Sequence, residues 1–186
     1  MIILGVDPGT LVTGYGLIEI ENNKVTVLEF DVIVNRNERS MPIRLRDIYS
    51  KLCEVITKHH PDEFAIETAF YGRNAQSALK IGQARGVSML AAVNNGIPTA
   101  EYSPREIKKA VVGNGAASKD QVKFMVKSIL RIRETPKLFD ATDALAVALC
   151  HHHRMTGIRS NGKSSGRHQN WASFVKANPD RILRPR

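Results

Sequence analysis

Two short apolar runs constrain the fold of this 186-residue chain more than any other feature. The runs "IILGVD" (residues 2–7) and "FAIE" (residues 64–67) show no alternation of apolar and polar residues. Strands of this kind are buried on both faces and are typical of the central, parallel part of a helix-covered sheet. Each run ends in an acid, Asp7 or Glu67. We therefore predict an α/β fold in which these carboxylates share the sheet edge where open α/β sheets bind ligands.

The rest of the chain shows the periodicities of three more strands and of five helices. Residues 13–21 and 24–34 alternate on either side of "NN", which predicts a β-hairpin with a tight Asn-Asn turn. Ser118, followed three residues later by Gln121, predicts a capping box at a helix start. The other expected elements are helices over 42–59, 75–93 and 104–112, a helix starting near residue 140, and a strand over 97–103. The order βββ-α-β-α-β-α-α-α predicts a mixed five-stranded sheet flanked by helices.

The last predicted helix begins with two acids although its middle is apolar on every side. In "FDATDALAVALCHHH" (residues 139–153), the apolar middle predicts a fully buried helix, yet the first turn carries Asp140 and Asp143. Taken alone, the first acid reads as an N-cap and the second as a partner of the helix dipole. Residues at i and i+3 lie on one helix face, so both also suit a site shared with Asp7 and Glu67.

Four neighbouring carboxylates would repel one another, and burial would raise their pKa values. A pair of divalent cations would make such a cluster tolerable. Mg²⁺ takes oxygen ligands from a few carboxylates and keeps positions for water and phosphate oxygens. Two ions about 3.5–4 Å apart activate a water and stabilise a leaving oxygen in phosphodiester hydrolysis. We therefore predict that Asp7, Glu67, Asp140 and Asp143 form a metal-dependent hydrolytic site.

The excess of basic residues lies mostly at the carboxyl-terminal end of the chain. The net charge is +9, and residues 151–186 contain eight Lys and Arg but a single acid. Such an excess favours a polyanionic partner. The Gly- and Ser-rich stretch 156–170 has no helical or strand period and predicts a flexible linker. We expect one domain over residues 1–155 and a basic, flexible tail over residues 156–186, which either tethers DNA without specificity or is disordered and has no function.

Cysteine usage and hydropathy favour the cytoplasm. Cys53 and Cys150 lie in helical patterns without the spacing of a metal site or a disulfide framework, as expected of reduced core thiols. The chain starts with "MIILGV", without a basic leader, and its apolar runs are far shorter than the roughly 20 residues of a membrane helix. We therefore expect a cytoplasmic protein that makes no contact with a membrane.

Four segments of this sequence resemble the RuvC family of Holliday-junction resolvases. Within residues 2–153 they follow the family's order and spacing: "ILGVDPGTLVTGYGLIE", "FAIETAFYGRNAQSALKIGQARGV", "VVGNGAASKDQVKFMV" and "DATDALAVALCHH". The stretch "NAQSALKIGQARGV" is particularly specific to that family. By contrast, sugar kinases and Hsp70-type ATPases also carry an Asp-x-Gly-Thr phosphate loop like "DPGT". The resemblance implies a ribonuclease-H-like fold.

The resemblance also implies an activity. Members of the family are homodimers that use Mg²⁺ or Mn²⁺ to nick two strands of like polarity in a four-way DNA junction, in homologous recombination and DNA repair. The nicks leave 5′-phosphate and 3′-hydroxyl ends, and the branch-migration proteins RuvA and RuvB are the expected partners. Asp7, Glu67, Asp140 and Asp143 fall on the family's catalytic acids.

Further positions match DNA contacts of the family. Lys108 and Lys119 match lysines near the scissile phosphate, where a positive charge offsets the charge of the transition state. Phe70 matches an aromatic residue that stacks on a base near the junction centre. A core phenylalanine is the other open reading, and "TAF" here replaces the usual "QVF". The remaining candidates for DNA contacts are Tyr71, Arg73, Asn74, Arg85 and Lys123.

Two helices carry patterns that each have two readings. Basic residues recur at i+4 steps from Lys119 to Arg131, which predicts either a phosphate-tracking surface or a solvated helix face. Gly82 and Gly86 form a small-xxx-small step, which predicts either close packing on the sheet or a helix contact across a dimer two-fold axis. The residues expected on the same face as these glycines are Ala78, Leu79, Met89, Leu90 and Val93.

Three other functions compete with junction resolution. A ribonuclease-H-like nuclease for RNA–DNA hybrids or ribosomal RNA shares the acids but should lack "NAQSALKIGQARGV". An actin-like ATPase or kinase needs two lobes and far more than 186 residues. An architectural junction-binding protein would keep the basic stripe and Phe70 but has no use for four acids. The histidines at 151–153 follow two turns of apolar helix and are expected at the surface or core edge rather than as metal ligands.

Overall fold

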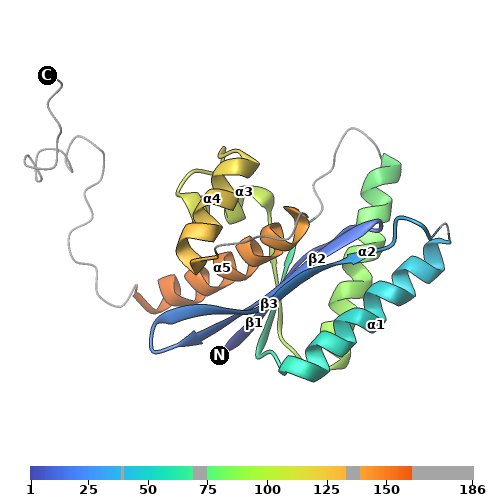
Figure 1. Cartoon of the computed structure of the whole chain (residues 1–186), viewed down its shortest axis with the longest axis horizontal. Coiled ribbons are helices and arrows are strands. Elements are labelled where there is room, and N and C mark those ends of the chain that lie inside the picture. Colours follow the sequence, from blue (N-terminus) through green and yellow to red (C-terminus); the bar gives the residue numbers. More distant parts are fainter. Residues whose placement is uncertain (39, 69–74, 133–138, 161–186) are drawn as a thin grey trace, which may run out of the picture. The chain divides into compact units, whose positions relative to one another are not determined.

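The computed structural model describes residues 1–38, 40–68, 75–132 and 139–160, which form a central sheet with helices on both faces (Figure 1). The strands are β1 (Ile2–Asp7), β2 (Val12–Glu21), β3 (Lys24–Val34), β4 (Glu63–Glu67) and β5 (Thr99–Tyr102). The helices are α1 (Met41–His59), α2 (Ala75–Asn94), α3 (Pro104–Val112), α4 (Lys119–Leu130) and α5 (Phe139–Ser160). The predicted order of elements is confirmed.

The strands form one mixed sheet in the order β3-β2-β1-β4-β5. The two apolar runs, β1 and β4, are central neighbours that pair in parallel, and β4 also pairs in parallel with β5. β1, β2 and β3 pair antiparallel in sequence order. The turn between β2 and β3 holds Asn22 and Asn23 at φ values of 50° and 63°, a left-handed conformation that asparagine tolerates. The prediction of a mixed five-stranded α/β sheet is thereby confirmed.

The sheet separates two hydrophobic cores. On β1, Leu4 and Val6 pack with buried residues of α1 and α2, whereas Ile3 packs with those of α3, α4 and α5. Figure 1 shows the same division, with α1 and α2 on one face of the sheet and α3 to α5 on the other. Because both faces are covered, β1 has no polar face, which explains its continuous apolar run. The segment Met1–Arg154 forms one compact unit.

Helix α5 lies directly on the sheet because glycines of β1 and β2 face it. A Cβ atom added to Gly5 would lie 2.2 Å from the carbonyl oxygen of Ala144, and one added to Gly16 would lie 2.7 Å from the Leu145 side chain. Real Cβ atoms do not make such short contacts, so a larger residue would push the helix away. As the sequence predicts, α5 is buried over residues 144–150, each at most 1% exposed.

Helix α2 exposes to solvent much of the apolar face for which the sequence left two readings open, packing on the sheet or a dimer contact. Leu79, Leu90 and Val93 are 66%, 49% and 57% exposed. Gly82 and Gly86 have no neighbouring atom within 4 Å of an added Cβ, so the reading of close packing on the sheet is wrong. Small side chains face the sheet instead and let the helix lie close to it, because they occupy little space. These buried residues are Ala84, Ser88, Ala91 and Ala92.

Helix α5 continues to Ser160, which corrects the predicted start of the flexible linker. Residues 156–160 are helical rather than irregular. Propensity does not stop the helix earlier, because the stretch contains no proline and Gly157 costs a helix only about 1 kcal/mol. The rest of the expected tail, residues 161–186, lies outside the described residues.

The histidines that follow the apolar part of α5 lie at the core edge, as predicted. The Nδ1 atom of His151 is 2.8 Å from the Tyr102 hydroxyl, and burial lowers the pKa of this histidine. The Nδ1 atom of His153 lies 3.1 Å from the carbonyl oxygen of Ala110. In the same helix Cys150 is buried and carries a free thiol. Within the part of the chain that the structure describes, no helix combines the length and the apolar character needed to span a bilayer.

Candidate active site

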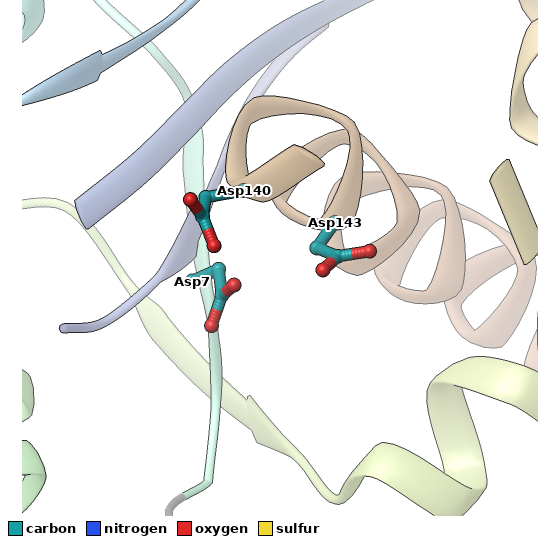
Figure 2. A group of neighbouring side chains, drawn as sticks. All are labelled: Asp7, Asp140 and Asp143. Atoms are coloured by element: carbon teal, nitrogen blue, oxygen red, sulfur yellow. The ribbon is translucent and has the colours of Figure 1, made fainter. Parts of the chain in front are cut away.

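The four predicted acids gather at the carboxyl edge of β1 and β4. These strands pair in parallel up to the residues before Asp7 and Glu67, so the two acids end the strands side by side. The first turn of α5 brings Asp140 and Asp143 to the same edge (Figure 2). One carboxylate oxygen from each of the three aspartates lies within 4.8 Å of the others. Glu67 lines the same cleft as Asp7 and Asp143.

A glycine of β2 explains how α5 reaches Asp7. Gly14 is the register partner of Asp7 in the antiparallel β1–β2 pair. A Cβ atom at Gly14 would lie 2.0 Å from the carbonyl oxygen of Asp140, so only glycine admits the first turn of α5 at this position. Gly14 is not among the site residues predicted from the sequence. The signal that marks it is the pair of alternate glycines in "TGYG", because glycine inside a strand often marks a close approach of backbone.

The cluster carries an unfavourable concentration of negative charge. Burial, followed by the charges of Glu67, Asp143 and Asp140, raises the pKa of Asp7 from 3.8 to about 8. Burial and then the charge of Asp143 raise the pKa of Glu67 from 4.5 to about 7. Burial also raises the pKa of Asp143, although Lys119 opposes the rise. At neutral pH, Asp7 therefore holds a proton unless a cation neutralises the cluster.

This set of donors fits a hard divalent cation. Carboxylate oxygens are the ligands that Mg²⁺ and Mn²⁺ prefer in proteins. The described acids Asp7, Asp140 and Asp143 each place one such oxygen within 4.8 Å of the other two, and Glu67 adds further oxygens in the same cleft. A cation bound among these residues would take the place of the proton on Asp7 and offset the mutual repulsion.

A cleft of about 300 Å³ lies beside the acids and is lined by residues of α3, α4 and α5. Lys108 of α3 and Lys119 of α4 are part of its lining. The ammonium of Lys119 donates a hydrogen bond to Asp143 at 3.2 Å, and the charge of Asp143 raises the pKa of the lysine. A capping box fixes the start of each of the two helices, including the box predicted at Ser118. Both lysines are therefore presented to the acids by rigid elements.

The other candidates for DNA contacts lie in different surroundings. Lys123 is one turn beyond Lys119 on α4, and its charge acts on Asp143 against the rise in pKa. Arg85 is held in an ion pair with Glu101 on β5. Four candidates lie outside the described residues: Phe70, Tyr71, Arg73 and Asn74. Residues that line the cleft but were not predicted from the sequence are Pro104, Ile107, Val122 and Ala146.

Comparison with known proteins identifies close relatives. The family model described as "Crossover junction endodeoxyribonuclease RuvC" matches residues 3–151. The protein of that name from Salinibacter ruber is 49% identical over 98% of this chain and 99% of its own length. The one from Cytophaga hutchinsonii is 46% identical over 97% of this chain and 88% of its own length.

Solved structures agree with this relationship. RuvC of Thermus thermophilus has 32% sequence identity and a TM-score of 0.77, over 84% of this chain and 96% of that chain. The same relative in complex with Holliday junction substrate also gives a TM-score of 0.77 at 32% identity, over 83% of this chain and 94% of that chain. The ribonuclease-H-like fold implied by the sequence motifs is therefore confirmed. With one family model across most of its length and relatives near half identity, the chain belongs to the RuvC family of crossover junction endodeoxyribonucleases.

Proposed function

We propose that this protein resolves four-way (Holliday) junctions by paired, symmetric nicks in two DNA strands of like polarity, in homologous recombination and DNA repair. Hydrolysis leaves 5′-phosphate and 3′-hydroxyl ends. The observation that carries the proposal is the meeting of Asp7, Asp140 and Asp143, whose oxygens lie within 4.8 Å of one another in a basic protein. The Thermus thermophilus relative in complex with Holliday junction substrate supports the choice of DNA structure.

In this proposal the acids hold cations and the lysines face the phosphate. Asp7, Glu67, Asp140 and Asp143 act as ligands of two Mg²⁺ ions, for which Mn²⁺ can substitute. Such a pair, when bound, supplies an activated water and stabilises the leaving oxygen. Lys119 orients the Asp143 carboxylate through its 3.2 Å hydrogen bond and keeps a positive charge beside the reacting phosphate.

Replacing Lys119 by alanine should reduce turnover much more than junction binding. The lysine side chain is 76% exposed, so its removal leaves the core intact. Loss of one group that stabilises transition-state charge lowers the single-turnover rate roughly 10²–10³-fold. Loss of one phosphate contact weakens binding only modestly and reduces the slope of the logarithm of the binding constant against the logarithm of the salt concentration by about one. The matched control is Lys51→Ala, at an exposed ion pair on α1 outside the lining of the cleft, which should keep the wild-type rate. An unchanged rate for Lys119→Ala would make that lysine structural.

We propose that the active form is a homodimer joined through α2. One stripe of this helix, here called the α2 face, is exposed and consists of Leu79, Gly82, Gly86, Leu90 and Val93. Exposed apolar patches of this kind mark protein contacts. Glycines within the stripe let a second helix approach closely, because interaxial distance depends on the side chains at the contact. A two-fold dimer presents two copies of the active site to a four-way junction.

An aspartate at the centre of the α2 face should dissociate the dimer. In Leu90→Asp, association would bury an unpaired charge in each protomer, which costs about 3 kcal/mol or more and raises the Kd more than about 100-fold. Sedimentation equilibrium measures the Kd, and the product pattern shows whether nicks are still paired. Leu28→Asp is the control, since Leu28 is 40% exposed on β3 and lies outside the α2 face. A dimer of unchanged affinity in Leu90→Asp would exclude this interface.

A cleavage assay with defined DNA structures tests the proposed activity. A mobile four-way junction, a linear duplex and an RNA–DNA hybrid of the same sequence are incubated with and without Mg²⁺, and the products are mapped to the nucleotide. We expect paired nicks at symmetric positions in the junction and little cutting of the other substrates, because the dimer matches the junction's symmetry. Equal cutting of the duplex would refute junction selectivity. Preferred cutting of the hybrid would favour the alternative nuclease function.

We also propose the remaining contacts on the strength of the family resemblance and the charge. Phe70 stacks on a base, and the basic segment 156–186 tethers DNA beside the nuclease domain over residues 1–155. RuvA and RuvB are the proposed protein partners. Both cysteines carry free thiols, which suits the reducing cytoplasm. The other proposed DNA contacts are Tyr71, Arg73, Asn74, Lys108 and Lys123.

A further inference from the structure

Part of the lining of the cleft beside the acids is aliphatic. Pro104 and Ile107 of α3, Val122 of α4 and Ala146 of α5 line it, and we call these four residues the aliphatic wall. Among the described lining residues, every polar side chain belongs to an acid or a lysine, and none is a neutral hydrogen-bonding group. Ile107, Val122 and Ala146 also belong to the core on this face of the sheet, but cations and phosphate oxygens make no use of the aliphatic atoms that they show to the cleft.

Both α3 and α4 line the cleft with charged and with aliphatic side chains. On α3, Ile107 directly precedes Lys108, and on α4, Val122 lies one turn beyond Lys119. A DNA strand also presents two kinds of group, an anionic phosphate and a deoxyribose. Ammonium groups suit phosphate oxygens, and aliphatic side chains suit the C2′ methylene, which has no hydrogen bond to lose when it leaves water.

From this pattern, and resting on the proposed function, we propose that the aliphatic wall receives the deoxyribose next to the scissile phosphate and rejects ribose there. A 2′-hydroxyl set against Ile107 or Val122 would lose its hydrogen bonds to water without gaining a partner. In the proposed function the acids hold cations and Lys108 and Lys119 face phosphate oxygens, and the Lys119 ammonium also donates to Asp143 at 3.2 Å. The site thereby selects DNA at the level of a single sugar.

Single-sugar substitutions in the junction test this proposal. The nucleotide on either side of the mapped nick is replaced by its ribo form or by its 2′-fluoro form, which has no hydrogen to donate. We expect ribose at one of the two positions to slow single-turnover cleavage by about 10- to 100-fold, the range in which an apolar pocket rejects an added hydroxyl. The 2′-fluoro sugar should be cut at nearly the deoxyribose rate. Unchanged rates with ribose at both positions, or an equal loss with fluorine, would overturn the proposal.

A variant of the wall links the effect to these residues. Val122→Thr adds a hydroxyl that can pair with the 2′-hydroxyl, so the ratio of deoxyribose to ribose rates should fall at least about threefold. Val126→Thr is the matched control, because Val126 is also buried, lies one turn further along α4 and is not among the residues that line the cleft. If Val122→Thr melts before the assay temperature, Ile107→Thr provides the same comparison from α3. A ratio that stays unchanged in the folded wall variant would overturn the assignment to the wall.

The same assay separates this proposal from the proposed function. If wild-type protein leaves the all-deoxyribose junction uncut, the resolvase function fails and the sugar selection fails with it. If the all-deoxyribose junction is cut and the ribose junctions are cut equally fast, only the sugar selection fails.

Discussion

We expect Asp7→Asn to abolish junction cleavage while junction binding survives. Asp7 is part of the proposed cation site with Asp140 and Asp143, and an asparagine there would remove negative charge that the cations need. Losing metal-dependent stabilisation of several kcal/mol lowers the rate by roughly 10³-fold or more. Binding depends mainly on basic groups and phosphates, so the loss of one negative charge should leave it equal or slightly tighter.

The same substitution should make the metal-free protein more stable, which separates it from a folding defect. The pKa of Asp7 is raised from 3.8 to about 8, so the folded protein favours the protonated carboxyl. The stability that this protonated group contributes is fully present below about pH 4 and is lost as the pH rises towards 8. At neutral pH in a chelator, Asp7→Asn should therefore raise the free energy of unfolding by about 1–3 kcal/mol. Asp47→Asn, at an exposed ion pair on α1, is the matched control. Cleavage near the wild-type rate, or a lower stability than wild type, would contradict these roles.

Removal of divalent cations should stop cleavage completely, and the requirement for Mg²⁺ should fall as the pH rises. Metal binding displaces protons from Asp7 and Glu67, whose pKa values are about 8 and about 7. Between about pH 6 and about pH 9 these protons are lost, so the half-saturating Mg²⁺ concentration should fall about tenfold or more. Cleavage rates over a grid of pH and Mg²⁺ at constant ionic strength measure this shift. Cleavage in a chelator, or a half-saturating concentration independent of pH, would contradict metal binding by these acids.

The strands and the helix that carry the four acids could be predicted because the sequence patterns that mark them are local. The runs that end in Asp7 and Glu67 lack alternation, which requires two covered faces and therefore central strands. The capping box at Ser118 and the Asn-Asn turn are also local signals, and the structure confirms both. The spacing of Asp140 and Asp143 places them on one helix face, although capping explains that pair equally well until β1 is seen beside it.

Features that depend on which surfaces meet were not predictable in the same way. The apolar stripe of α2 suited either packing on the sheet or a dimer contact, and the structure shows that it faces solvent, because Ala84, Ser88 and their neighbours fit the narrow space against the sheet. The role of Gly14 becomes evident only when the carbonyl of Asp140 lies where its Cβ would be. The aliphatic wall combines residues of three helices. In each helix the residue concerned, Ile107, Val122 or Ala146, also packs in the hydrophobic core, so its sequence pattern shows only a core position.

Anomalous diffraction from crystals grown with Mn²⁺ tests most directly whether acids distant in the sequence form one metal site. We predict manganese peaks among the carboxylates of Asp7, Asp140 and Asp143 in the wild-type protein, and a loss of occupancy there in Asp7→Asn. Manganese bound only elsewhere in protein that still cuts junctions would contradict the account.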